Sequence, residues 1–341
     1  MASKPRFMKR FFQFFQILAL SLLVVTCAAC AFAADKPNYP TKKIRYIVPS
    51  NPGGGWDLTS RFITPAWSKI LGGATFEYVY EPAAGTMVGL NNLVKAPGDG
   101  YTMLCSFISY TNNTMAFQMA PYKMEDFAFL GNLASDFDVL YIKADDTRWK
   151  DIDEFVAYAR TTDKPITVGV PISLSPSHLT GAIFQELGEL NLTIIPFKSG
   201  SEQRNALLGA HVDACISSSK TTVSLANDVR VLTVFGEANP VKALWDVKLI
   251  NAVAGYEEMP ECGTYTAVHV SKKLETQNPD LFKHLADTLK EAFDDPDTLA
   301  AFTKADQQDY MDYRTPEECQ EIFKGYDTKL NKYGHLIDPN K

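Results

Sequence analysis

Three short loops carry the residue types that can bind an anion. The first is a run of three glycines, Gly53, Gly54 and Gly55, whose backbone N–H groups are left uncovered because glycine has no side chain. A predicted helix follows at once and places the positive end of its dipole at the same point. A negatively charged group can therefore bind here, although a glycine run is also an ordinary turn between a strand and a helix.

The second loop has the composition of a helix start. Ser175 is predicted as the N-cap, Pro176 as the first helical residue, and Ser177 and His178 as hydrogen-bond donors of the first turn. In a binding role these hydroxyl and amide groups would hold one carboxylate. In the alternative, the segment is a plain helix cap and His178 a surface or packing histidine.

The third loop follows a predicted strand and contains Lys198, Ser199 and Gly200. Lys198 would add a positive point charge, or would simply be solvated. Trp56, beside the glycine run, either packs under its loop or forms an apolar wall against a ligand. Because ligands of open α/β sheets bind at the carboxyl ends of the strands, the three loops predict one shared cleft.

The motifs of common enzyme classes are missing from the sequence. A dinucleotide fingerprint that starts at Gly53 would need a glycine at position 58, where Leu58 stands. No Gly-Lys-Ser/Thr phosphate loop and no Gly-x-Ser-x-Gly elbow occurs, and no two of the five histidines are four residues apart. We therefore expect a binding protein without catalytic residues, cofactor or metal.

Apolar strands alternate with helical patterns along the chain, which predicts an α/β fold. Strands are predicted at residues 44–48, 76–80, 101–106, 166–170, 193–197, 214–217 and 229–235, with helices between most of them. The first three form a βαβαβ unit, and the pattern restarts after a crossing near Asp138. The C-terminal part is predicted to be helical, so we expect two lobes with a ligand cleft between them.

The first 33 residues have the layout of a signal peptide. An apolar run at residues 11–25 precedes the cleavage signal Ala31-Phe32-Ala33, and the positive charges before it are Lys4, Arg6, Lys9 and Arg10. We expect cleavage before Ala34 and export of the mature chain. The alternative is a lipid anchor on Cys27 or Cys30, which lie at the end of the apolar run.

Composition narrows the class of protein further. The 341 residues are long enough for two domains, and 46% hydrophobic with 21% charged residues is ordinary globular composition. The 33 Lys and Arg against 40 Asp and Glu give −7, and loss of the four cations in residues 1–33 makes it −11. No concentrated basic stretch remains, so nucleic acid is not expected as a partner.

Four cysteines remain after the signal segment. Cys105 and Cys215 lie in predicted strands, where buried free thiols are expected. Cys262 and Cys319 either form a disulfide in an oxidising compartment or stay free, because the sequence does not supply the required Cα separation.

Taken in order, the loops resemble one known family. The motifs that carry the likeness are residues 39–44, 48–49, 52–57, 81–85, 99–102, 175–179, 197–198 and 207–213. They are similar to the Bug family, the periplasmic solute receptors of tripartite tricarboxylate transporters. Ser50-Asn51 and residues 83–86 depart from the usual family pattern, as does the segment Val270-Ser271-Lys272-Lys273. The first two departures lie on the expected pocket side, so they leave the ligand open.

The resemblance implies a two-lobed Venus flytrap that binds a small organic carboxylate, most simply a di- or tricarboxylate, in the periplasm. It implies large and small membrane subunits as partners, or, in the alternative, a signalling partner for which the protein is a sensor. Lobe 1 would comprise residues 34–138 and 260–341, and lobe 2 residues 139–259. The expected ligand-binding residues are Asn51, Gly53, Gly54, Gly55, Trp56, Asp57, Ala84, Ser175, Ser177, His178, Lys198, Ser199 and Gly200.

Overall fold

The structure of the protein, a computed structural model, describes residues 39–82, 86–118 and 120–338. The predicted signal peptide, residues 1–33, and Ala84 lie outside these ranges. Lys42–Lys341 forms one compact unit, and the helices and strands of the described residues all belong to it.

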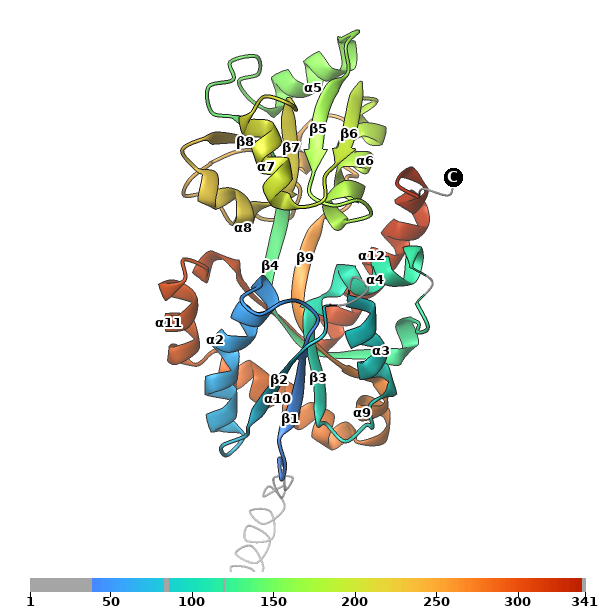
Figure 1. Cartoon of the computed structure of the whole chain (residues 1–341), viewed down its shortest axis with the longest axis vertical. Helices are drawn as coiled ribbons and strands as arrows, with labels where there is room; N and C mark the ends of the chain where they lie inside the picture. Colours follow the sequence, from blue (N-terminus) through green and yellow to red (C-terminus); the bar gives the residue numbers. More distant parts are fainter. Residues whose placement is uncertain (1–38, 83–85, 119, 339–341) are drawn as a thin grey trace, which may run out of the picture. The chain divides into compact units, whose positions relative to one another are not determined.

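Two lobes, each a sheet covered by helices, make up this unit (Figure 1). Lobe 1 contains β1 (Ile44–Val48), α2 (Gly55–Ile70), β2 (Phe76–Tyr80), α3 (Met87–Lys95), β3 (Thr102–Phe107), α4 (Ile108–Phe117), β9 (Gly263–Ser271), α9 (Lys272–Gln277), α10 (Pro279–Phe293), α11 (Pro296–Lys304) and β10 (Met311–Arg314). Lobe 2 contains α5 (Ile152–Thr161), β5 (Ile166–Val170), α6 (Pro176–Gly188), β6 (Leu192–Pro196), α7 (Gly200–Leu208), β7 (Ala214–Ser218), α8 (Ser219–Thr222) and β8 (Val229–Val234). β4 (Phe127–Lys143) and α12 (Pro316–Tyr333) take part in both lobes. The α/β class and the two lobes confirm the fold expected from the sequence.

β4 is a single long strand that serves two sheets. Its first part pairs antiparallel with β9, from Phe127 opposite Ser271 to Phe137 opposite Gly263. From Asp138 onward the same strand pairs antiparallel with β7, and from Val139 with β8. In lobe 1, β1, β2 and β3 are parallel and β9 is antiparallel to β3, whereas in lobe 2 β5 is parallel to β6 and β7. The strand changes lobe near residues 136–138.

Three chain segments are bonded together at this crossing point. The Asp138 N–H donates to Cys262 O (3.3 Å), the Phe235 N–H donates to Asp138 O (2.8 Å), and the Cys262 N–H donates to Phe235 O (3.1 Å). The Phe137 ring lies against Gly236 and Gly263, where a Cβ atom would come within 2.2 and 2.9 Å of the ring. Because successive side chains of a strand alternate between its faces, Phe137 fills one face and leaves its two neighbours on the other.

α12 connects the cores of the two lobes. Cys319 and Phe323 in its first half are buried in the lobe 1 core, together with Phe127 and Phe129 of β4. Leu330 and the residues around it are buried in the lobe 2 core. The lobe boundaries expected from the sequence assign the whole C-terminal part, and so all of α12, to lobe 1. α12 packs into both cores, and those boundaries stay a prediction.

α2 buries more than one face. Its sequence predicts a helix from apolar residues at four-residue steps, Leu58, Phe62, Ala66 and Ile70, beside Ile63 and Leu71, and Ile63, Ala66 and Leu71 are buried, together with Trp67. Leu58 is 36% exposed, and Phe62 is covered from the side by Phe302 of α11, at 4.9 Å between ring centres. The helix is therefore confirmed, and its burial extends beyond one stripe because α2 packs between the sheet, α10 and α11.

The four cysteines Cys105, Cys215, Cys262 and Cys319 are buried and unpaired in the structure. The disulfide considered between the last two is therefore not formed. Among the residues that the structure describes, no helix is long and apolar enough to cross a membrane, and no group of three or more potential metal ligands occurs.

Candidate functional site

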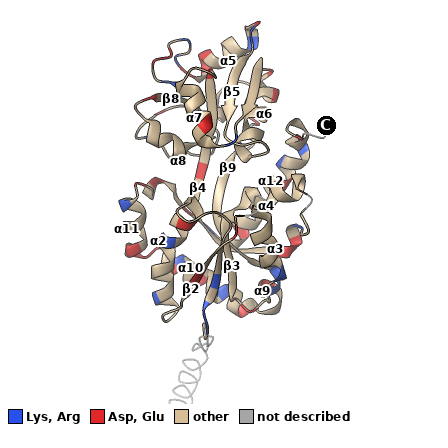
Figure 2. Ribbon diagram, viewed as in Figure 1, with Lys and Arg blue, Asp and Glu red and all other residues tan. Residues whose placement is uncertain are grey.

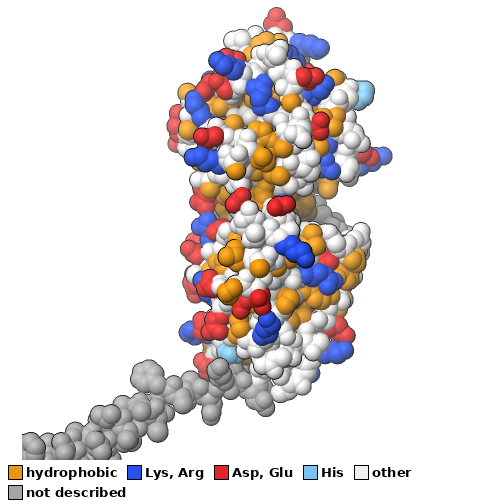
Figure 3. Space-filling model, turned by 90° about the vertical axis from the view of Figure 1, so that its left-hand side faces the viewer, with side chains coloured by type: hydrophobic (Ala, Val, Ile, Leu, Met, Phe, Trp, Pro, Cys, Tyr) orange, Lys and Arg blue, Asp and Glu red, His pale blue; other side chains and the backbone are white. Residues whose placement is uncertain are grey.

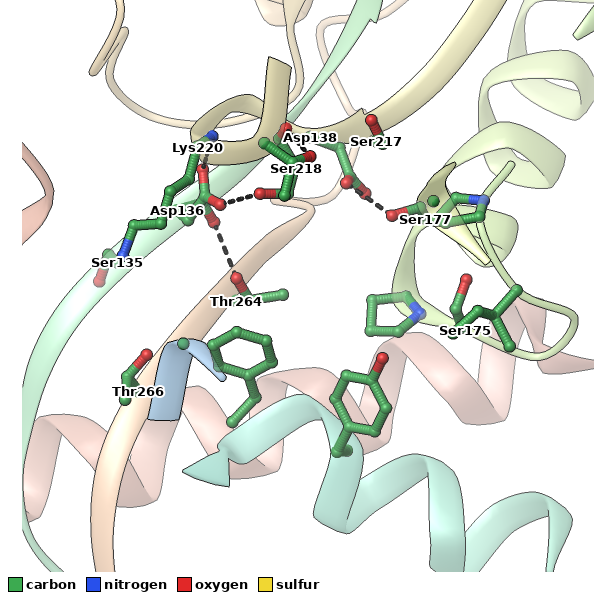
Figure 4. Close-up of a pocket in the computed structure, with 18 of the residues that line it drawn as sticks. Ser135, Asp136, Asp138, Ser175, Ser177, Ser217, Ser218, Lys220, Thr264 and Thr266 are labelled. Atoms are coloured by element: carbon green, nitrogen blue, oxygen red, sulfur yellow. Dashed lines mark hydrogen bonds between the residues drawn. The ribbon is translucent and has the colours of Figure 1, made fainter. Parts of the chain in front are cut away.

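A cavity of about 330 Å³ lies between the two lobes (Figure 4). Lobe 1 lines it with Gly55, Thr59, Phe107, Tyr110, Ala134, Ser135, Asp136, Thr264 and Thr266. Lobe 2 lines it with Pro171, Ile172, Ser175, Pro176, Ser177, Gly200, Arg204, Ser217, Ser218, Lys220 and Thr221. Asp138, at the crossing point of β4, completes the wall. The cavity is large enough for a small metabolite, and it is rich in hydroxyl groups.

Two carboxylates of β4 face this cavity. Asp136 and Asp138 are two residues apart in one strand, so they lie on the same face of it. They are 7% and 4% exposed, and Figure 2 shows the acidic stretch where β4 passes between the lobes. Buried charges of equal sign are costly unless other groups compensate them, so the surroundings of each carboxylate decide what it does.

The carboxylate of Asp136 accepts hydrogen bonds from the turn that begins α8. The Ser219 hydroxyl donates to its Oδ1 (2.5 Å), as does the Lys220 backbone N–H (3.3 Å), and the Ser218 hydroxyl donates to Oδ2. The carboxylate therefore caps α8 from the neighbouring strand. Its negative charge also acts on the Lys220 ammonium.

Asp138 accepts hydrogen bonds from two hydroxyl groups and forms no ion pair with the residues that the structure describes. The Ser177 and Thr180 hydroxyls of α6 donate to Oδ1 and Oδ2, each at 2.7 Å. Burial raises the pKa of Asp138 to about 6, although these two hydrogen bonds work against the rise. Other titratable or charged groups that interact with it are Asp136 of β4, Tyr110 of α4, Cys262, and Tyr326 and Lys329 of α12.

Two cations line the lobe 2 side of the cavity. Burial lowers the pKa of Lys220, and the charge of Asp136 opposes the change. The Lys220 ammonium lies 4.9 Å from the centre of the Tyr310 ring, within cation–π range. Arg204, one turn after Gly200 on α7, donates to the Ser201 hydroxyl (3.2 Å). α7 is held in place by Gln203, whose side-chain amide donates to Gly169 O and Ile216 O at 2.9 and 3.0 Å.

Two backbone N–H groups of the glycine run already donate hydrogen bonds within the protein. The Gly53 N–H donates to Asp57 Oδ2 (2.8 Å), and the Gly54 N–H donates to Asn51 O (3.3 Å). Burial opposes ionisation of Asp57, but hydrogen bonds from Gly53, Arg61 and Tyr80 lower its pKa overall. Of the expected residues in this loop, Gly55 lines the cavity, whereas Asn51, Gly53, Gly54 and Asp57 build the loop around it.

Trp56 lies behind the cavity wall. Its ring packs edge-on against Phe107 (5.2 Å between centres) and Tyr110 (5.6 Å), and both of these rings line the cavity. Trp56 itself is half-buried and is not among the lining residues. It can therefore act on a ligand through the two rings that it supports.

The loop before α6 forms the helix start that the sequence predicted. The Ser175 hydroxyl accepts from the His178 N–H (3.2 Å), which leaves the Ser175 hydroxyl proton for another acceptor. His178 Nδ1 accepts from the Leu174 N–H (3.1 Å), and burial lowers the pKa of this histidine. Ser175 and Ser177 line the cavity, whereas His178 supports the loop.

The third loop places one expected residue at the cavity, Gly200. Ser199 caps α7 by accepting from the Glu202 N–H (3.2 Å), and the backbone N–H of Lys198 donates to the Glu202 carboxylate (3.2 Å). The Lys198 side chain is exposed. The positive charge on this side of the cavity therefore comes from Arg204 and Lys220.

Several lining residues were missed by the sequence reasoning. Asp136 and Asp138 stand in a strand that was not predicted, and their signal was a pair of acidic residues at strand spacing near the expected crossing. Lys220 follows three serines at the end of a predicted strand, and Arg204 is one helical turn beyond Gly200. Both positions follow from the rule that ligands bind at strand ends and helix starts.

Two lobes that share a lined cavity define a two-lobed solute-binding protein. The sequence profile described as "Tripartite tricarboxylate transporter family receptor" (TctC) matches residues 61–340, so the chain belongs to this family of receptors. A protein of the TAR-I ttuE-ttuC' intergenic region of Agrobacterium vitis is 26% identical over 304 residues, 88% of this chain and 86% of that protein. BugT of Bordetella pertussis is 24% identical over 203 residues, 59% of this chain and 62% of BugT. The resemblance to Bug proteins is confirmed.

Solved structures share the fold. A TctC solute-binding protein from Polaromonas has a TM-score of 0.73 and 22% identity, with 86% of this chain and 99% of that chain covered. The periplasmic binding protein BugD has a TM-score of 0.65 and 21% identity, with 88% and 99% covered. MatC from Rhodopseudomonas palustris, solved with bound malate, has a TM-score of 0.64 and 18% identity, with 88% and 100% covered. These chains establish a periplasmic solute-binding fold.

Proposed function

We propose that the protein is an exported receptor that captures a small organic carboxylate and delivers it to a tripartite membrane transporter. The observation that carries the proposal is the cavity of about 330 Å³, in which the cations Arg204 and Lys220 share the wall with Ser175 and with Gly55 in the first turn of α2. A hydroxyl donor, a helix N-terminus and two positive charges are suited to an anionic group. The family of the chain supports the transport role.

The ligand class proposed first is a di- or tricarboxylate. The related MatC was solved with malate, a small dicarboxylate, which supports this class for the present chain. Phe107, Tyr110 and Ile172 offer apolar contacts to a short carbon skeleton between polar ends. No cofactor, metal or covalent step is needed.

Capture works by reversible closure of the two lobes. A ligand that contacts both lobes binds the closed state more tightly than the open state, so it shifts the population toward closure. The membrane subunits then recognise the closed receptor. We place the receptor in the periplasm, released by cleavage after residue 33, with lipid attachment as the alternative.

The test is a thermal-unfolding screen of the mature protein, residues 34–341, against C4–C6 carboxylates, aromatic acids, nucleotides and neutral sugars. A ligand at one hundred times its Kd stabilises the native state by about 2.7 kcal/mol. At least one acid is expected to raise the melting temperature, and a screen in which only sugars or nucleotides do so contradicts the proposal. Uptake of the identified acid by cells that lack the receptor distinguishes transport from sensing, because a sensor deletion leaves uptake intact.

A further inference from the structure

The charged side chains that line the cavity in the described part of the chain balance one another. They are Asp136 and Asp138 of β4, Arg204 of α7 and Lys220 of α8. A dicarboxylate brings two further negative charges into this space, where burial makes uncompensated charge costly. On the outer face drawn in Figure 3, by contrast, basic and acidic side chains are interspersed and open to water, which screens them. A bound diacid therefore needs a further positive charge in the cavity.

Of the two cavity carboxylates, Asp138 is the one that lacks a nearby cation. It is 4% exposed, and among the described residues it forms no ion pair within 4 Å. Asp136, in contrast, accepts from the Ser219 hydroxyl (2.5 Å) and its charge acts on the Lys220 ammonium. The negative charge of Asp138 is thus the less compensated of the two.

The surroundings of Asp138 favour its neutral form. Burial raises its pKa to about 6 and the charge of Asp136 adds to the rise, whereas the Ser177 and Thr180 hydroxyls and the Lys329 charge lower it. The other titratable or charged groups near it are Tyr110 of α4, His178 of α6, Arg204 of α7, Lys220 of α8, Cys262 before β9 and Tyr326 of α12. Burial lowers the pKa of His178, so this histidine is neutral above pH 7.

The hydrogen-bond partners of Asp138 can serve both of its protonation states. The Ser177 hydroxyl donates to Oδ1 and the Thr180 hydroxyl to Oδ2, each at 2.7 Å, and Figure 4 shows the bond to Ser177. The Thr180 hydroxyl also lies 3.1 Å from Pro176 O, a second acceptor in its own helix. Because a hydroxyl has one proton, it can turn to Pro176 O when Oδ2 is protonated. Protonation of Asp138 therefore leaves Thr180 with an acceptor.

We propose that Asp138 binds the ligand in its protonated form, so that the receptor takes up one proton together with each dicarboxylate. The proton comes from solvent and stays on Asp138, whose O–H donates to one carboxylate of the ligand in a charge-assisted hydrogen bond. Arg204, which forms no ion pair with the described residues, is left to pair with the other carboxylate. This inference rests on the proposed function and makes Asp138 the residue that couples affinity to pH.

The first experiment measures affinity against pH by calorimetry on the mature protein. The probes are succinate, malate, glutarate and adipate, each compared with its monoamide, in which a neutral amide replaces one carboxylate. Between about pH 7 and pH 8 the diacids and the free Asp138 are both ionised, so the Kd of at least one diacid is expected to rise about tenfold. The Kd of its monoamide should change less than about twofold, because the amide N–H can donate to the ionised Asp138.

The outcomes separate the inference from the proposed function. If the diacids that bind do so with a Kd that is the same at both pH values, the inference is overturned while the proposed function stands. If the monoamide shows the same rise as its diacid, the inference is also overturned, because the proton is then not linked to the second carboxylate. If none of the diacids binds at any pH, the proposed ligand class fails and the inference fails with it.

The number of protons taken up gives a readout that needs no variant. Heats of binding are measured at about pH 7.5 in phosphate and in Tris, two buffers whose ionisation enthalpies differ. The difference is expected to give about one proton taken up per diacid bound and about none per monoamide. An uptake near zero for the diacid overturns the inference.

The variant Asp138→Asn identifies the group that takes the proton. The amide keeps the size of the side chain and can itself donate to the ligand, so the Kd of the diacid should become independent of pH and proton uptake should disappear. Asp213→Asn is the matched control: Asp213 also accepts a threonine hydroxyl, from Thr167 at 2.6 Å, but lies outside the cavity lining. The control is expected to keep the pH dependence and the proton uptake. A pH dependence that persists in Asp138→Asn overturns the inference.

Discussion

Asp138 is one buried carboxyl group whose ionisation is expected to lower the stability of the folded protein. The pKa of Asp138 rises from 3.8 to about 6 on folding, mainly because burial disfavours the charged form. A raised pKa of an acid in the folded state means that ionisation opposes folding. The contribution of Asp138 to the free energy of unfolding is therefore expected to fall as pH rises from about 4 to about 6, and to stay low above it. Burial of His269, whose pKa is lowered to about 4, contributes in the opposite direction over the same range.

Asp138→Asn should remove the loss of stability that ionisation of Asp138 causes. The shift of about two pKa units corresponds to about 3 kcal/mol at about 1.4 kcal/mol each, so the variant is expected to be more stable than the natural protein by up to this amount at pH 8. The two proteins should converge near pH 4. Denaturant unfolding between pH 4 and pH 8 measures the difference, and a gap that does not grow with pH contradicts the prediction.

Trp56 is expected to act through its neighbours. Trp56→Thr removes two edge-on ring contacts, to Phe107 and Tyr110, each worth about 0.5–1.5 kcal/mol beyond simple burial. We expect a modest loss of stability and a several-fold weaker affinity for the ligand found in the screen, because both rings line the cavity. Trp245→Thr, at a half-buried tryptophan outside the cavity lining, should lower stability with no change in affinity. Equal affinities in the two variants would show that the rings do not need Trp56.

At the scale of elements, a buried glutamine fixes α7 against the lobe 2 sheet, and α7 places Arg204 at the cavity. Gln203 is fully buried and bridges the carbonyls of Gly169 in β5 and Ile216 in β7, and the next residue is Arg204. Gln203→Leu leaves two buried carbonyls without these donors, which costs about 1–3 kcal/mol. Calorimetry should also show weaker ligand binding, because Arg204 loses its anchor. The exposed neighbour Asn205, changed to Ala, is the control that should leave both quantities nearly unchanged.

Sequence patterns located most of the elements but missed three strands of the described residues: β4, β9 and the short β10, the last two in a part predicted to be helical. The seven predicted strands are all present within one or two residues, from β1 to β8, because each is a short apolar run bounded by turn residues. β4 was missed because its residues 127–142 are all buried, on both faces, so polar and apolar positions do not alternate. Asn132, Ser135 and Asp136 interrupt the apolar run further and give it the composition of a loop.

The candidate site was predicted only where its residues have a local signal in the sequence. Gly55, Ser175, Ser177 and Gly200 were found because cap and turn residues have local signals. Arg204, Lys220 and Asp138 reach the cavity through sheet pairing and lobe contacts that join distant parts of the chain, and a single sequence does not contain this information. The expectation that Lys198 supplies the charge stays untested, and its side chain is exposed.

At the scale of the whole molecule, the two lobes share β4 and α12 and so should unfold together. Phe323→Ala removes a buried ring from the lobe 1 core, and Leu330→Ala removes a buried side chain from the lobe 2 core, at costs of about 3–5 and 2–5 kcal/mol. Each variant is expected to show one calorimetric transition at a lower temperature, because neither sheet is complete without β4. Two separate transitions, with only the one of the altered lobe displaced, would show that the lobes are independent.

The position of β9 also constrains the order in which the strands of the two lobes can pair during folding. β9 lies between β3 and β4, and its pairing of Leu104 with His269 joins residues made far apart in time during synthesis. The strands β5 to β8, in contrast, come from one continuous stretch that is finished earlier. Lobe 1 is thus begun first and completed late, since β1, β2 and β3 pair with one another near the start of the chain but are joined to β4 only through β9.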